Sequence, residues 1–197
     1  IKYPRGVEKK LKSKVTEFLK ENNEIIIILK KFDTKKIEFL EINKDIAMVQ
    51  PLIYDYEGEN IQYLCKRNPS LLIQIIRGFF RKNINRFSIL SRYNDYYEMR
   101  NIAYANKIVE STYLSGAFML CRTELLDKVD WFDERFFMYL EDADLTRRLS
   151  KLGRCVQNPF LKVRHVWAQG SRKKISLRII ACISFIKYSF KWGLKLF

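Results

Sequence analysis

Residues Ser115 to Arg148 read SGAFMLCRTELLDKVDWFDERFFMYLEDADLTRR. This stretch contains a turn of small residues at Ser115-Gly116-Ala117, a Trp-Phe-Asp-Glu loop, and an acidic cluster from Glu141 to Asp144 at the start of a predicted helix. Acidic side chains are favourable in the first turn of a helix, so the cluster can simply cap it. The same carboxylates can also hold a cation or take a proton from a hydroxyl group. All three interpretations stay open at this point.

The composition is typical of one globular domain. With 197 residues, 48% of them hydrophobic, the chain can bury one core and is too short for two domains of typical size. The excess of 37 Lys and Arg over 22 Asp and Glu gives a formal net charge of +15 and predicts an anionic partner: nucleic acid, acidic lipid or a phosphorylated substrate. The four cysteines are scattered and the chain has one histidine, so we expect reduced thiols and no zinc site.

Strands and helices alternate along the sequence, which predicts an α/β fold built on a mostly parallel sheet. Between residues 77 and 107 a basic, aromatic-rich segment lacks clean periodicity and fits either a loop or a pair of helices. Apolar and β-branched runs predict strands at 25–29, at 46–49 (stopped by Pro51), at 110–121, at 155–157 and at 161–165. Helical spacing predicts helices at 37–42, 69–80, 122–129 and 142–152.

The C-terminal segment from Ile175 to Phe197 has the pattern of an amphipathic helix. Its apolar residues share one helical face, and lysines lie beside that face. Its longest uncharged apolar run, Ile179 to Ile186, is far shorter than the roughly 20 residues that a membrane-spanning helix needs. Such a helix suits the surface of a membrane, and equally a terminal helix packed on its own domain.

Several motifs together resemble the second half of a family 2 glycosyltransferase, most closely the bacterial rhamnosyltransferase type that builds capsule and cell-wall polysaccharides. These motifs are GAFMLCR at 116–122, WFDERFFMY at 131–139 and EDADL at 141–145, with supporting segments between Ile46 and Gly193. The resemblance implies an A-type glycosyltransferase fold, a Rossmann-like mixed sheet flanked by helices, that lacks its N-terminal nucleotide-binding strands. It divides the chain into a partial catalytic domain (1–174) and an amphipathic C-terminal helix (175–197). It also implies that the chain is the C-terminal part of a larger protein or the product of a truncated gene.

The resemblance implies an inverting transfer from a nucleotide-sugar donor to a hydroxyl of a saccharide or lipid-linked acceptor, with rhamnose as the suggested sugar. Inverting displacement needs a base that removes the acceptor proton as the new bond forms, and the motif assigns this role to Asp142. Asp144 and Arg148 are spaced i, i+4 and can pair on the helix surface. The residues that the resemblance assigns to substrate binding are Gly116, Ala117, Trp131, Glu141 and Arg148.

A nucleoside diphosphate leaving group calls for a divalent cation with oxygen ligands, Mg²⁺ or Mn²⁺. The resemblance places the metal ligand at Asp33, after the predicted strand 25–29, and a second metal-site residue at His165. Lys30 and Lys31 occupy positions where the family has neutral or acidic residues, which weakens the match at Asp33.

Three functions remain in competition. The first is a metal-dependent glycosyltransferase on the inner face of the bacterial membrane, in contact with lipid through the C-terminal helix. The second is a truncated or degenerate relative that binds without catalysing transfer. The third is a basic nucleic-acid-binding module, which the net charge suggests but no recognition motif supports.

Overall fold

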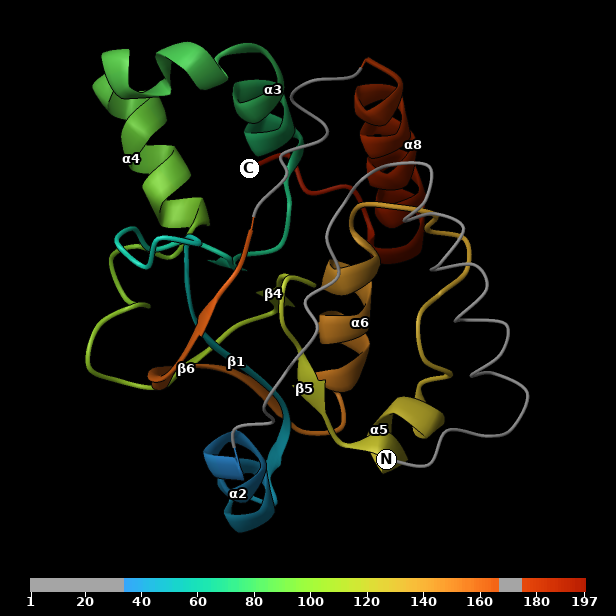
Figure 1. The fold of residues 1–197 in the computed structure, drawn as a ribbon. Coiled ribbons are helices and arrows are strands. Elements are labelled where there is room, and N and C mark those ends of the chain that lie inside the picture. The colour runs from blue at the N-terminus through green and yellow to red at the C-terminus, as the bar shows by residue number, and fades with distance from the viewer. Residues whose placement is uncertain (1–33, 167–174) are drawn as a thin grey trace.

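The computed structural model describes residues 34–166 and 175–197 and confirms the α/β class (Figure 1). The predicted strand at 25–29 and Asp33 lie outside these residues. The helices are α2 (Thr34–Ile42), α3 (Leu71–Phe79), the 3-10 helix η1 (Arg81–Arg86), α4 (Ser88–Tyr97), α5 (Thr123–Lys128), α6 (Glu141–Leu149) and α8 (Ile175–Trp192). The strands are β1 (Ile46–Tyr54), β2 (Cys65–Lys66), β3 (Val109–Glu110), β4 (Tyr113–Leu114), β5 (Leu120–Cys121) and β6 (Arg154–Arg164).

The larger sheet of the described residues has the order β3-β6-β1-β5. Only β1 and β6 pair in parallel, whereas β3 and β5 pair antiparallel to their neighbours. The sheet is therefore mixed, as the resemblance implied, and not mostly parallel, as the alternation of strands and helices had indicated. The reason lies in the segment 110–121, which was predicted as one strand. At Ser111 the backbone N–H still donates to the Cys155 carbonyl of β6 (2.9 Å), and the hydroxyl donates to the Lys66 carbonyl of β2 (2.6 Å). The chain then pairs with β2 instead of β6, so the segment divides among β3, β4 and β5.

Strand β1 does not end at Pro51, contrary to the sequence prediction. Proline lacks an N–H group and is tolerated in a sheet at edges and bulges. Here β5 pairs only with Met48 and Val49, and the register with β6 shifts between Pro51 and Leu52. The shift lets β1 continue to Tyr54 and joins the two predicted strands of residues 155–165 into the single strand β6.

The segment from residue 77 to 107 contains η1 and α4, followed by turns, so the interpretation as a pair of helices holds for its first part. Helix α3 begins after Ser70, whose hydroxyl accepts the Ile73 N–H. The buried side chain of Glu98 binds Arg77 of α3 at 2.6 Å and Arg100 at 2.5 Å, and this ties the two helices together.

Helix α6 packs on β1 and β4 and lies between the sheet and α8 (Figure 1). Its residues Leu145 and Leu149 share one buried cluster with Met48 of β1. Its Thr146 is fully buried, and its hydroxyl contacts both backbone polar groups of Leu114 at 3.3 Å. This packing fixes the start of α6 relative to the turn that follows β4.

The amphipathic helix predicted over 175–197 is observed as α8, which ends at Trp192, so the last residues of the chain are not helical. One face packs against the domain through the buried side chains of Ser184, Phe185 and Tyr188. The opposite face exposes a continuous apolar stripe, whose members are between 46% and 89% exposed: Ile175, Ile179, Ile183, Ile186 and Phe190. The structure is therefore compatible with both interpretations from the sequence: a helix packed on its own domain and a helix at a membrane surface. Within the part of the chain described here, no helix is both long and apolar enough to cross a membrane.

Candidate active site

The Asp142 carboxylate lies in the first turn of α6 and points at the turn after β4. Its Oδ2 accepts the Gly116 N–H (2.8 Å) and its Oδ1 accepts the Ala143 N–H (2.8 Å). Two backbone donors fix the direction of the carboxylate. Asp142 is 8% exposed, yet Gly116 beside it is exposed. The carboxylate therefore lies directly beneath a residue that has no side chain to cover it.

Gly116 leaves the space above Asp142 open. A Cβ at this position would lie 3.5 Å from the Asp142 Cβ and 3.7 Å from its Oδ2. Any larger side chain would therefore extend along the carboxylate. The neighbouring Ser115 carbonyl accepts a hydrogen bond from the buried Gln50 amide of β1 (2.6 Å), so the turn is anchored to the sheet. Gln50 belongs to a supporting segment of the resemblance, but its positioning role was not predicted.

Glu141 is the second acidic group at the start of α6. Its Oε2 is buried and has no hydrogen-bond partner among the described residues. Burial, together with the neighbouring charge of Asp142, raises the pKa of Glu141 to about 7. The carboxyl group is therefore divided between its protonated and ionised forms near neutral pH, and it can donate or accept a hydrogen bond there.

Exchange of Glu141 for glutamine is expected to flatten the pH dependence of stability. Because folding raises the pKa of this carboxyl group, the folded state is favoured while the group is protonated and loses stability as the pH rises from its ordinary pKa of 4.5 to about 7. A shift of this size corresponds to a loss of up to roughly 3 kcal/mol. Urea unfolding near pH 5 and near pH 8 measures it. An equal loss in Glu141→Gln and in the parent chain would contradict the assignment.

The Asp144 side chain points into the protein interior and is fully buried. Its Oδ2 accepts from Arg148 Nε (2.7 Å), as the i, i+4 spacing predicted. Its Oδ1 accepts from Trp192 Nε1 (2.8 Å) and Lys191 Nζ (2.7 Å), both at the end of α8. Three donors from two helices thus meet at one carboxylate, which makes Asp144 a structural centre.

Arg148 and Trp131, both predicted to bind substrate, are placed in the same internal network. The Arg148 guanidinium donates to the backbone carbonyls of Val129 and of Trp131, the latter at 2.6 Å. The Trp131 indole N–H donates to Asp127 (2.9 Å). Arg148 thereby holds the loop that leads to α6. Trp131 and Ala117 are both half-buried.

His165 directly follows β6 and is held by Gln62. Its Nδ1 lies 2.9 Å from Gln62 Oε1, and the Gln62 amide donates to the His165 carbonyl (2.7 Å). Burial lowers the pKa of His165, so the ring is neutral at physiological pH. Because Nδ1–H points at Gln62, the free lone pair of the ring is on Nε2, and this is the nitrogen that could bind a metal ion. Among residues 34–166 and 175–197, no group of three or more His, Cys, Asp or Glu side chains is placed to hold a metal ion.

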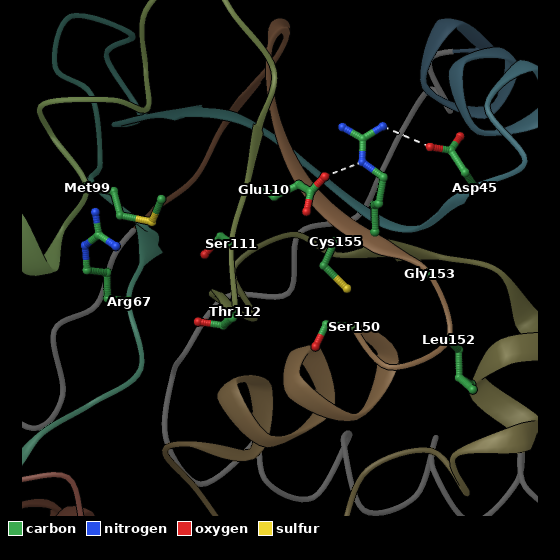
Figure 2. Close-up of a pocket in the computed structure, with 11 residues that line it drawn as sticks. Asp45, Arg67, Met99, Glu110, Ser111, Thr112, Ser150, Leu152, Gly153 and Cys155 are labelled. Carbon is green, nitrogen blue, oxygen red and sulfur yellow. Dashed lines mark hydrogen bonds and ion pairs between the residues drawn. The ribbon is translucent and has the colours of Figure 1, made fainter.

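A cavity of about 550 Å³ lies at the other end of α6 (Figure 2). The nine residues of α6 span about 13 Å, so this cavity is well separated from Asp142. Arg154, paired with Asp45 and Glu110, forms part of its wall. Of the predicted site residues that the structure describes, none lines it. Its lining residues are Asp45, Arg67, Met99, Glu110, Ser111, Thr112, Ser150, Leu152, Gly153, Arg154 and Cys155.

Comparison with known proteins agrees with the resemblance that the motifs carry. The chain is 34% identical over 103 residues to the N-acetylglucosaminyl-diphospho-decaprenol L-rhamnosyltransferase of Mycobacterium tuberculosis, which covers 52% of this chain and 31% of the relative. It is 33% identical over 93 residues to the rhamnosyltransferase WbbL of Escherichia coli K12, which covers 47% of this chain and 30% of the relative. No family model and no solved structure matches.

These similarities support a glycosyltransferase. The aligned region spans about a third of each relative's length.

Proposed function

We propose that the chain carries the acceptor side of an inverting, family 2 glycosyltransferase with the A-type fold. The observation that carries the proposal is the Asp142 carboxylate, held by the N–H groups of Gly116 and Ala143 beneath an exposed glycine. A base for sugar transfer needs a fixed direction and an approach that a hydroxyl can use, and this site offers both. The similarity to two rhamnosyltransferases supports the same reaction class.

In the proposed reaction the acceptor hydroxyl attacks the anomeric carbon of the donor sugar. The new carbon–oxygen bond forms on the face opposite the leaving nucleoside diphosphate, and the carboxylate of Asp142 takes the hydroxyl proton. Glu141, whose pKa is about 7, is suited to a hydrogen bond with a second hydroxyl of the acceptor. The two carboxyl groups thus have different roles in the proposal: backbone donors direct Asp142 toward the acceptor hydroxyl, and burial keeps Glu141 partly protonated.

The proposal includes a divalent cation, Mg²⁺ or Mn²⁺. When bound, such an ion neutralises the charge that develops on the leaving diphosphate. His165 fits a role near that group, because its ring is neutral and is oriented by Gln62. Asp33 is the proposed second ligand from the sequence resemblance.

We propose a nucleotide-activated sugar, rhamnose in the first instance, as donor and a lipid-linked saccharide as acceptor. The printed name of the Mycobacterium tuberculosis relative specifies an acceptor attached to diphospho-decaprenol. An acceptor of that kind resides in a membrane, so its enzyme must work at the membrane surface. The apolar stripe of α8 is the surface of this chain that suits such a location, on the inner face of the bacterial membrane.

Charge substitutions on the α8 stripe are expected to weaken binding to lipid. Each exposed isoleucine that enters the acyl boundary contributes about 1.5–3 kcal/mol. The double variant Ile179→Glu/Ile183→Glu should therefore bind vesicles of anionic phospholipid at least about tenfold more weakly, measured by cosedimentation. Ile42→Glu is the matched control, because Ile42 is 80% exposed but lies on α2. Equal binding by both variants would exclude α8 as the contact.

The direct test of the proposed function is a transfer assay with the complete product of the gene. Nucleotide-activated rhamnose, a polyprenyl-diphosphate N-acetylglucosamine acceptor and Mn²⁺ are supplied, and the disaccharide is detected by mass spectrometry. The proposal expects transfer with inversion at the anomeric carbon. Binding of the donor diphosphate without any transfer would instead indicate a non-catalytic relative.

A further inference from the structure

Helix α8 contacts the backbone and side chains of the loop that leads into α6. The Ser184 hydroxyl donates to the Met138 carbonyl (2.6 Å), and Lys187 Nζ donates to the Arg135 carbonyl (2.7 Å). Lys191 Nζ lies 2.7 Å from Asp133 Oδ2. Three successive turns of α8 therefore hold three points of the loop.

The loop needs external contacts to keep its conformation. Asp130, Trp131, Tyr139 and Leu140 all have φ between 52° and 68°, in the left-handed region that non-glycine residues rarely occupy. Leu140 immediately precedes α6 and provides no side-chain cap to the helix. The direction in which α6 begins, and with it the position of Asp142, thus depends on what holds this loop.

Lys191 links the loop to Asp144, a buried residue of α6. The same ammonium group that binds Asp133 in the loop also lies 2.7 Å from Asp144 Oδ1, two residues after Asp142. The ring of Trp192 shares Asp144 Oδ1 at 2.8 Å. A change in the position of α8 therefore reaches both sides of the Asp142 backbone.

The other face of α8 is the apolar stripe, and it is suited to an anionic lipid surface. On a helical projection the stripe lies opposite Ser184, Tyr188 and Lys191, and exposed Arg178 and Lys187 lie on either side of it. The net charge of +15 complements acidic lipid headgroups. One helix thus carries a lipid-facing stripe and, on its back, the contacts that position the acidic site.

We infer that α8 is a positioning element that couples contact with an anionic lipid surface to the geometry of the Asp142 site, with Lys191 as the central link. The inference rests on the proposed function and adds a regulatory role to it. An isolated amphipathic helix is only marginally stable in water, so lipid on one face and the loop on the other stabilise the same helical state. Two ligands that stabilise one state bind with positive coupling.

The test uses hydrogen exchange, which does not depend on activity. Vesicles of anionic phospholipid are expected to slow amide exchange in residues 131–140 of the parent chain by about fivefold or more. Lys191→Met should still bind the vesicles but lose this protection, and Lys191→Arg should restore it in part. Lys195→Met is the matched control, because it removes the same charge from the exposed tail after α8 and should behave as the parent chain.

Activity gives the second readout. Lys191→Met is expected to lower kcat about tenfold or more with little change in the KM of the donor, since a small displacement of the base slows the chemical step. Vesicle binding without any change in exchange of the loop would overturn the coupling and leave the membrane contact intact. Absence of vesicle binding would overturn both. Protection of the loop in a protein without transfer activity would support the coupling and contradict the proposed function alone.

Discussion

Replacement of Asp142 by asparagine is expected to lower the rate of sugar transfer by about a hundredfold to ten-thousandfold, the range that a general base contributes. An amide of the same shape cannot accept the hydroxyl proton. Its single carbonyl oxygen can still accept the Gly116 N–H, while its NH2 group cannot accept the Ala143 N–H, so stability is measured beside the rate. The measurement is kcat for transfer to the lipid-linked acceptor, together with the midpoint of urea unfolding.

Asp130→Asn is the matched control for this experiment. Asp130 is exposed, lies in the loop before Trp131 and has a φ of 55°, a conformation that asparagine tolerates well. Its exchange should leave kcat unchanged within about twofold, as expected of a surface substitution. If Asp142→Asn retains the activity of this control, the assignment of the base is wrong and the acidic cluster is a helix start without a catalytic role.

Replacement of Asp144 by alanine is expected to destabilise the chain by about 3–5 kcal/mol, the cost of removing one partner from a buried ion pair. Arg148, Lys191 and Trp192 would each lose one partner. Lys191 would keep its ion pair with Asp133, whereas the Arg148 charge would be left with backbone carbonyls alone. The lower free energy of unfolding should appear in urea denaturation at neutral pH. The control Asp45→Ala removes an exposed carboxylate paired with Arg154 and should change stability very little.

The two aspartates therefore separate the two interpretations of the cluster. Because an exposed glycine lies above Asp142, its replacement should lower the transfer rate far more than the free energy of unfolding. Asp144 has three internal donors and should affect stability first. A stability loss of equal size in both variants would mean that Asp142 is also a structural residue.

Local patterns in the sequence predicted the elements that carry the site. The i, i+4 spacing of Asp144 and Arg148 correctly predicted their pairing, because both residues lie on one short helix whose geometry is fixed. The apolar spacing of residues 175–197 correctly predicted α8, since one face had to pack and the other did not. The roles of Glu141, Ala117 and Trp131 toward substrate stay predictions.

Contacts between distant segments could not be predicted in this way. The side chain of Gln62 meets His165 across 103 residues, and Trp192 meets Asp144 across 48 residues. Their pairing depends on how the sheet and α8 come together, which no local spacing records. The raised pKa of Glu141 has the same origin in its larger part, because burial by distant segments raises it most and the charge of adjacent Asp142 adds to the shift.

The predicted sheet was wrong at two places where local sequence was interpreted without its tertiary context. Pro51 was read as the end of a strand, but a register shift beside it and the shortness of β5 make its missing N–H harmless. The segment 110–121 was read as one strand from its apolar content. The structure divides it because its first residues pair with β6 and Tyr113 and Leu114 pair with β2, a strand about 45 residues earlier.

The most direct test of the central claim is a crystal structure of the complete gene product with a nucleoside diphosphate, Mn²⁺ and an acceptor saccharide. The account predicts an acceptor hydroxyl within about 2.6–3.2 Å of an Asp142 carboxylate oxygen, beside Gly116. An acceptor bound at the distant cavity beside Arg154, with no hydroxyl near Asp142, would contradict it.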